Sequence, residues 1–515
     1  FVDGTIFVTG FTPGNLIVNR IGDGSSVLGS ITYPLNLQEF LPSGVQVQTM
    51  NQQFANANLL TEPGELNTSI GHLNSLDALV GVPGYNSVSG VSNVAVSQPK
   101  VINILGLGAA VNGRVVFPAN GNSPCFTDGY LTSLLPMNTT TFYAAGTGIN
   151  GSGGIWYYNG TNYLQLNGDF NATRTIETYN GNLYFSTDVS PAGIYQLGSG
   201  LPTTSGQIAT LIIPTSSPRG FSISPDGNTA FVTDDSPLNV NSGGGIQKWT
   251  QQNGTWTKVY THAHRTSGLT VDFSDSLARI YATTFLVSPG SDNNKILKII
   301  DTDANATATE LSLAGTNYLY KGLDFAPALP PSLPQIAQVD HPTCKQSTGK
   351  VHLTGLPAGQ WRITGNPGGS KTGTGSTAIV ENLVAGQSYS FKVTSYTGRS
   401  SNFTTTVAVN VQPEIPAVPT GSAIQKRCQG SDLSELSLNQ ANVLWYASAN
   451  STIALNATTS LINNTHYFAT QLHANSCESA TRCDVLAKLV NNGEWKGENE
   501  GSWKLASNWC GGVPA

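Results

Sequence analysis

Charged residues are scarce in this sequence, since only 10% of its 515 residues are Asp, Glu, Lys or Arg, against roughly a quarter in an average soluble protein. The 24 basic and 30 acidic residues leave a net charge of −6, which provides no basic surface for a nucleic acid or an anionic membrane. Hydrophobic runs are also short, and none approaches the ~20 apolar residues of a membrane-spanning helix. We therefore expect neither a nucleic-acid partner nor a membrane-spanning segment.

The motifs of nucleophilic, metal-dependent and nucleotide chemistry are missing as well. The sequence contains no GxSxG, HExxH or P-loop pattern. None of its six cysteines forms a CxxC pair, which excludes a zinc ribbon and a thioredoxin-type redox motif. The small number of acids also makes a pair of catalytic carboxylates, as in glycosidases, a poor expectation. The sequence therefore predicts a protein that is not an enzyme and uses no cofactor.

Two short patterns imitate metal sites. In His262-Ala-His264 the alternation would place both rings on one face of a strand, but no third ligand accompanies them. The segment from Asp301 resembles the start of a calcium loop, although Ala306 stands where the loop needs Gly and Ser312 where it needs Glu. We interpret these patterns as polar residues of a strand and of a turn, and predict no metal site.

The abundant residues favour turns and strands, because Gly, Asn and Ser suit turns while Val, Thr and Tyr suit pleated sheets. The chain has 56 Gly, and an internal repeat uses many of them. One phrase, Arg219-Gly-Phe-Ser-Ile-Ser-Pro-Asp-Gly followed by a second strand up to Asp234, is typical of a tight hairpin. The phrase recurs at 174–188 and 267–284, in truncated form at 321–327, and loosely at 128–146.

A second phrase lies out of phase with the first, for example in Gly154-Ile-Trp-Tyr and Gly245-Ile-Gln-Lys-Trp. Each unit therefore holds about four strands in roughly 45–50 residues, the size of a propeller blade. An all-β fold with an N-terminal β-propeller over residues 1–327 is expected, with seven blades by length and six as the alternative. The truncated copy at 321–327 would close the ring with a strand near 5–10 or 14–20.

The amino-acid sequence of these repeats resembles that of a family of secreted bacterial propeller proteins. The resemblance rests on Gly14-Asn-Leu-Ile-Val-Asn-Arg-Ile-Gly-Asp-Gly24, Arg219-Gly-Phe-Ser-Ile-Ser-Pro-Asp-Gly, Gly245-Ile-Gln-Lys-Trp-Thr and Gly268-Leu-Thr-Val-Asp-Phe, and it covers most of residues 10–327. It implies a propeller fold and an extracellular location, and no established reaction.

After residue 327 the chain changes character. A Pro-rich linker at 326–334 leads into short alternating strands with regular turn signals, which predict an immunoglobulin-like sandwich over 328–412. A second Pro-rich linker opens another small β unit over 413–489, and residues 490–515 begin a further module or form a tail. The sequence thus predicts tandem Ig-like modules behind the propeller, with Trp361 and Trp445 filling their cores.

These modules resemble Ig-like repeats in surface proteins of gliding or polysaccharide-degrading Bacteroidetes. The resemblance rests on His341-Pro-Thr-Cys344, Gly355-Leu-Pro-Ala-Gly-Gln-Trp361, Asn382-Leu-Val-Ala-Gly-Gln-Ser-Tyr389, Leu444-Trp-Tyr446 and Cys477-Glu-Ser479. It implies export by the type IX secretion system, although the C-terminal sorting domain of such proteins is absent from this sequence.

The resemblance also implies a disulfide between Cys428 and Cys477. The first module lacks the second cysteine of the pattern, near Gly398-Arg-Ser-Ser401, so Cys344 would stay unpaired or pair elsewhere. A Cys483–Cys510 bridge is the other possibility, and Cys125 has no assigned partner. Five of the six cysteines lie after residue 340, and an extracellular chain with one or two disulfides accounts for them best.

Aromatic residues are the remaining candidates for recognition. Trp156, Trp249 and Trp256 could stack on sugar rings if they lay on one propeller face. Several aromatics recur at one position of the repeat, and a repeated aromatic belongs more often to the core between blades. We therefore keep the three tryptophans as weak glycan-contact candidates.

Together these features favour a non-enzymatic extracellular or cell-surface protein for adhesion, a filament or a coat, with the propeller displayed on an Ig-like stalk. Its partners would be copies of itself, other surface proteins or glycans. The alternative is a carbohydrate-binding protein accessory to polysaccharide degradation. A propeller lyase or glycosidase ranks third.

Overall fold

A computed structural model of the chain describes residues 10–51, 53–54, 58–63, 73–117, 124–238, 243–285, 294–396, 399–474, 476–497 and 501–514. This described part is all-β, with one helical turn of four residues, α1 (Val94–Ser97), and two 3-10 turns at Leu433–Glu435 and Ala506–Asn508. Within it, no helix is long and apolar enough to cross a bilayer.

Four antiparallel sheets of four strands each follow one another along the chain, and each sheet is a meander. Their strands are β10 (Leu131–Pro136), β11 (Phe142–Gly146), β12 (Gly154–Tyr158) and β13 (Tyr163–Asn167); β14 (Ile176–Tyr179), β15 (Asn182–Thr187), β16 (Gly193–Leu197) and β17 (Ala209–Pro214); β18 (Pro218–Ile223), β19 (Thr229–Asp234), β20 (Gly245–Gln252) and β21 (Thr255–His262); β22 (Thr266–Asp272), β23 (Arg279–Thr284), β24 (Lys295–Ile300) and β25 (Ala308–Leu313).

The N-terminal strands and the last propeller strand form a ten-stranded sheet that contains two further four-stranded units. β26 (Leu319–Phe325) pairs with β1 (Leu16–Ile21), which confirms that the truncated repeat closes the ring with an N-terminal strand; residues 5–9 lie outside the described residues. The remaining strands of these units are β2 (Thr32–Phe40) and β3 (Gln46–Asn51), then β6 (Asn74–Leu76), β7 (Leu79–Asn86), β8 (Lys100–Gly106) and β9 (Val111–Phe117), with β4 (Gln53–Phe54) and β5 (Asn58–Pro63) between the two.

The first strands of the six units contact one another in cyclic order, β26, β6, β10, β14, β18 and β22, and then β26 again. This closed ring is a β-propeller-like arrangement with six blades in the described residues, the smaller of the two expected numbers. Division by the repeat length overestimates the number because the N-terminal part contains long connections, such as residues 87–99 between β7 and β8. The hairpin prediction is confirmed at Asn180-Gly181, where both residues have the positive φ that a tight two-residue turn requires.

Residues 335–408 form two sheets that share a core containing Val351, Trp361 and Phe391. We call this unit the sandwich. One sheet consists of β27 (Gln335–Asp340), β28 (Thr348–Thr354) and β31 (Thr377–Val384). The other consists of β30 (Ser370–Thr374), β29 (Gln360–Asn366), β32 (Ser388–Ser395) and β33 (Val407–Ala408).

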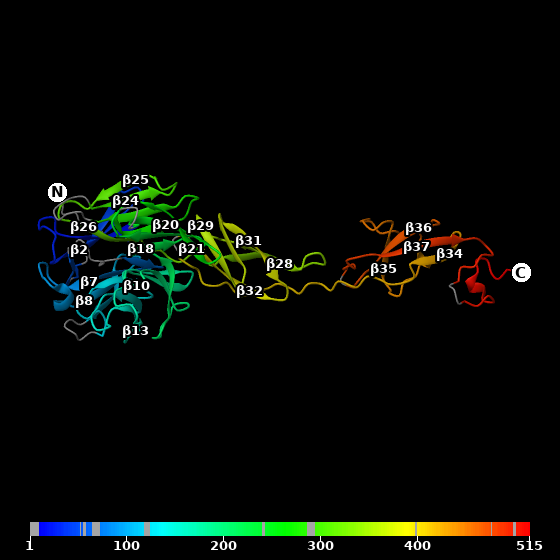
Figure 1. The fold of residues 1–515 in the computed structure, drawn as a ribbon, viewed down its shortest axis with the longest axis horizontal. Coiled ribbons are helices and arrows are strands. Elements are labelled where there is room, and N and C mark those ends of the chain that lie inside the picture. Colours follow the sequence, from blue (N-terminus) through cyan, green and yellow to red (C-terminus); the bar gives the residue numbers. More distant parts are fainter. Residues whose placement is uncertain are drawn as a thin grey trace.

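The following unit, which we call the distal unit, has a single sheet in the order β34 (Ile424–Cys428), β37 (Cys483–Val490), β36 (Thr465–Gln471) and β35 (Val443–Tyr446). β34 runs parallel to β37, and Trp445 lies in the core beneath them, as expected. Figure 1 shows the propeller, the sandwich and the distal unit following one another along the long axis of the molecule.

The disulfides differ from the expected pairing. Cys428 and Cys477 are both oxidised, but Cys344 pairs with Cys477 and Cys428 pairs with Cys510. The Cys428–Cys477 prediction is therefore wrong, because it assumed that each module closes its own disulfide. The first bridge instead joins the sandwich to the distal unit. Cys125 and Cys483 are not part of either disulfide, and since Cys510 pairs with Cys428, the expectation of a Cys483–Cys510 bridge is also wrong.

Candidate functional site

The two ends of the propeller channel differ in what covers them. The inner strands β14, β18 and β22 end beside the sandwich: Arg362 Nη1 donates to Tyr179 Oη at 2.8 Å, and Gln360 Nε2 donates to Asp275 O at 2.7 Å. We call this the stalk face. The opposite end, where the inner strands begin, is the outer face. Strands of six residues separate the two faces by about 20 Å.

The outer face carries a group of arginines that the repeat generates. Arg174, Arg219 and Arg265 lie at the start of the inner strands of three successive blades. Asp188 and Asp235 follow the second strands of the first two of these blades, and Phe285 follows the second strand of the third. We call these six residues the arginine cluster.

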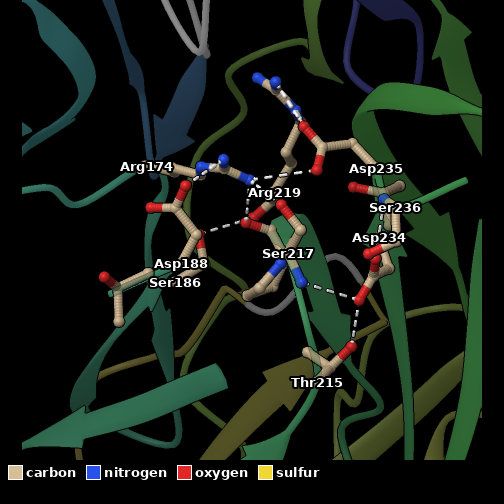
Figure 2. Close-up of polar contacts among 12 residues, drawn as sticks. Arg174, Ser186, Asp188, Thr215, Ser217, Arg219, Asp234, Asp235 and Ser236 are labelled. Carbon is tan, nitrogen blue, oxygen red and sulfur yellow. Dashed lines mark hydrogen bonds and ion pairs between the residues drawn. The ribbon is translucent and has the colours of Figure 1, made fainter. Parts of the chain in front are cut away.

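Arg174 connects two blades within this cluster (Figure 2). Its Nη2 lies 2.5 Å from Asp188 Oδ2, its Nη1 lies 3.5 Å from Asp235 Oδ1, and Nη1 also donates to Ser217 Oγ at 3.0 Å. One planar guanidinium thus holds carboxylates from two blades and a hydroxyl between them.

Asp235 is the centre of the cluster. Arg219 Nε donates to Asp235 Oδ2 at 2.5 Å, and Arg265 Nη2 donates to the backbone oxygen of Asp235 at 3.2 Å. Burial raises the pKa of Asp235, but the Arg219 and Arg174 guanidinium groups outweigh burial and hold the pKa below its usual range. The Arg219 and Arg265 guanidinium groups lie over Phe285, 4.9 and 5.1 Å from the ring centre.

Asp234, next to it, has a purely structural role. Its carboxylate is buried and accepts hydrogen bonds from Thr215 Oγ1 at 2.5 Å and from the backbone N–H groups of Ser217 and Ser236, both at 3.0 Å. Asp234 therefore stabilises the turns around it, while Asp235 forms ion pairs. The sequence signal for the cluster is the Arg that opens two copies of the repeat phrase, at positions 174 and 219.

The stalk face closes over a narrow cavity of about 70 Å³. Glu177, Ser222, Thr270 and Asp324 line it from the same repeat position in four blades, and Arg399 of the sandwich lies at its edge. The Asp324 carboxylate accepts hydrogen bonds from Ser75 N at 2.6 Å and from Thr270 Oγ1 at 3.1 Å. Sequence reasoning did not single out Glu177 or Asp324.

Burial raises the pKa of Glu177 well above its ordinary value, and the neighbouring Asp324 raises it further. Two carboxylates on one cavity are a requirement of glycoside hydrolysis. This cavity, however, is far smaller than the ~300–1,000 Å³ of small-molecule sites and holds space for a few water molecules only. The pair is therefore a buried polar group of the channel rather than a substrate cleft.

The two patterns that imitate metal sites meet in the structure. His262 Nε2 lies 3.0 Å from Asp301 Oδ1, and Lys248 Nζ lies 2.6 Å from Asp301 Oδ2. β21 ends at His262, so the expectation that His262 and His264 share a strand face is wrong. Within the described ranges, no group of three His, Cys, Asp or Glu side chains is arranged to bind a metal ion. The contacts of Asp301 with Lys248 and His262 join the blade of β18–β21 to the blade of β22–β25.

The tryptophan candidates do not form a sugar platform. Trp156 and Trp249 are each 7% exposed and lie in cores between blades, where their indole N–H groups donate to Gly153 O and Gln247 Oε1. Their candidacy as glycan contacts is wrong, because the repeated aromatic fills the space between sheets. Trp256 is partly buried and packs against the same core as Trp249.

Comparison with known proteins gives no family. No family model matches the sequence, and no curated protein does. Solved structures to which the chain is similar include a candidate 6-phosphogluconolactonase from Bacteroides fragilis (11% identity, TM-score 0.33, 77% of this chain and 96% of that chain). The periplasmic gluconolactonase of Pseudomonas aeruginosa matches with the same four values. The extracellular domain of a one-component system from B. thetaiotaomicron matches at 12% identity and a TM-score of 0.32, over 76% of this chain and 58% of that chain.

Proposed function

We propose that this chain is a non-enzymatic extracellular or cell-surface protein that displays its propeller on a stiff stalk of Ig-like modules, for adhesion or for a filament or coat. The observation that carries the proposal is the docking of the sandwich on the stalk face of the propeller. This docking covers one end of the channel and leaves the outer face directed away from the stalk.

The docking contacts are specific and partly buried. Arg399 is 4% exposed, and its Nη2 donates to Ser75 Oγ at 3.1 Å and to Ala326 O at 3.2 Å. A charge buried in an interface is costly unless its partners are positioned for it. These contacts therefore support one fixed orientation of the propeller on the sandwich.

The Cys344–Cys477 disulfide supports a stiff stalk further along the chain. It joins the sandwich to the distal unit, which the Pro-rich linker at 413–419 already connects. Two separate connections restrict bending between two units more than one linker does. The disulfides also support an oxidising, extracellular location, and export by a type IX system is part of the proposal through the resemblance of the modules.

Small-angle X-ray scattering of the oxidised full chain tests the geometry. We expect the distance distribution of a single elongated particle, and a broader one for Cys344→Ser/Cys477→Ser, with Cys428→Ser/Cys510→Ser as the control that leaves the two units cross-linked. A compact or freely jointed wild-type particle would contradict the stalk.

Beads coated with the full chain test the role. We expect them to adhere to each other or to polysaccharide-coated glass, with no turnover of lactones or polysaccharides by the soluble chain. Dispersed beads that attach to neither surface, or measurable turnover, would contradict a non-enzymatic adhesive role.

A further inference from the structure

We propose that the arginine cluster on the outer face binds an acidic sugar residue, through a carboxylate or a sulfate ester. The inference deepens the proposed function, since it rests on the outer face being the displayed one, and it names the chemical class of the ligand.

Position is the first argument. Arg174, Arg219 and Arg265 lie at the starts of three successive inner strands, so they line one side of the channel axis on the outer face. The described contacts of the sandwich with the propeller lie at the opposite ends of these strands. Of the three side chains, only Arg265 is exposed, since Arg174 and Arg219 are 12% and 3% exposed, so Arg265 is the group that a ligand at this end meets.

Charge is the second argument. Arg174 and Arg219 are paired with Asp188 and Asp235, and the Asp234 carboxylate lies beside them through Ser217. Arg265 forms no ion pair with a described residue, so its single charge is the one left for a monoanion such as a uronate or a sulfate ester.

The presentation of Arg265 is the third argument. Arg265 is exposed, and the contacts of its guanidinium with described residues include one hydrogen bond to Asp235 O and its packing over Phe285. A guanidinium carries five N–H donors in a planar fork that fits carboxylate and sulfate oxygens in pairs. Phe285 supports the plane from one side, so the edge of the fork is available to an anion.

The neighbouring acceptors favour a sugar over a simple anion. The Asp188 side chain is 38% exposed, and one of its two oxygens accepts from Arg174. Carboxylate oxygens have further acceptor positions, which suit the hydroxyl groups beside the acid group of a pyranose ring. An acidic sugar thus offers an anion for Arg265 and hydroxyls for Asp188.

Isothermal titration of the full chain with polygalacturonate, chondroitin sulfate and uncharged dextran tests the proposal. We expect binding to one or both acidic polymers that weakens as salt is raised, and none to dextran. Binding to polygalacturonate alone identifies the carboxylate as the recognised group. Binding to chondroitin sulfate alone, a polymer that carries both carboxylates and sulfate esters, identifies the sulfate ester as the recognised group.

Arg265→Gln should weaken binding about tenfold or more, because a charged hydrogen-bond partner of the anion is lost. Arg265→Lys, which keeps the charge and loses the fork, should fall between. Lys258→Gln removes one exposed charge from the outer strand β21 and should bind as the wild type does. Equal affinity of Arg265→Gln and wild type, or equal binding of dextran, would overturn the proposal and show that the cluster serves only to tie the blades together. The scattering test of the stalk is independent of this outcome.

Discussion

Arg399 of the sandwich donates a hydrogen bond to the backbone oxygen of Ala326, the residue that follows the last propeller strand, at 3.2 Å. Burial lowers the pKa of Arg399, and the nearby Asp324 and Asp77 carboxylates oppose this shift. The contact lies beside the buried cavity that contains Asp324. The propeller and the sandwich therefore share a polar junction at the end of β26.

Arg399→Ala should weaken this junction. The substitution removes the two hydrogen bonds of the buried guanidinium, to Ser75 Oγ and Ala326 O, and hydrogen bonds from a charged group contribute about 1.5–3 kcal/mol. We expect faster proteolytic cleavage in the linker at 326–334 and a lower unfolding midpoint. Lys371→Ala, on the exposed edge strand β30, is the control. A linker cleaved at the wild-type rate in Arg399→Ala would contradict a docked sandwich.

Glu177→Gln should stabilise the chain at neutral pH. The pKa of Glu177 is higher in the folded than in the unfolded chain because of its burial, so the folded state binds the proton more tightly. The stability difference between wild type and variant is then smallest near pH 4 and grows as the pH rises from the unfolded pKa through the folded one. Urea unfolding from pH 4 to 8 measures it, with the exposed Glu414→Gln as control. A constant difference across this range would contradict a raised pKa.

The sequence predicts the propeller because each blade hairpin carries a local signal in its own turn, as at Asn180-Gly181. It does not predict the blade number, because the N-terminal strands have diverged from the repeat and only their pairing with β26 shows where the ring closes. The sequence also does not predict which cysteines pair in the disulfides. Their pairing depends on how the sandwich and the distal unit lie against each other, and Cys344–Cys477 spans 133 residues.

The arginine cluster was only partly predictable, for a related reason. The repeat places Arg174 and Arg219 at equivalent positions, which a comparison of the copies reveals. Arg265 and Phe285 belong to a copy whose phrase differs, so their approach to Asp235 follows from the packing of adjacent blades.

The second disulfide should control the C-terminal segment. Cys510 is bonded to Cys428 of β34, and the segment carries Trp495, Trp503 and Trp509 in mutual contact, with ring centres 4.8–6.1 Å apart. Cys428→Ser/Cys510→Ser should release this segment, lower the stability of the distal unit by about 2–4 kcal/mol and shift tryptophan emission to longer wavelength. Cys344→Ser/Cys477→Ser should leave the emission unchanged, and equal emission of all three proteins would contradict the bond's role.

Asp301→Asn should destabilise the propeller by about 1–3 kcal/mol, since it removes an ionised acceptor from buried donors. Burial raises the pKa of Asp301, but hydrogen bonds from His262 and Lys248 outweigh it and hold the pKa below its ordinary value. The stability that Asp301 contributes is therefore complete above the unfolded pKa, near pH 4, and is lost as the pH falls through the folded pKa. The stabilities of wild type and variant should then converge in acid and separate at neutral pH.

Thermal unfolding of the Asp301→Asn variant and the wild type from pH 3 to 7 measures this difference, with Asp303→Asn in the adjacent exposed turn as the matched control. Because a depressed carboxyl pKa requires the pairing with Lys248 and His262, a variant whose deficit stays constant down to pH 3 would show that Asp301 acts only through packing.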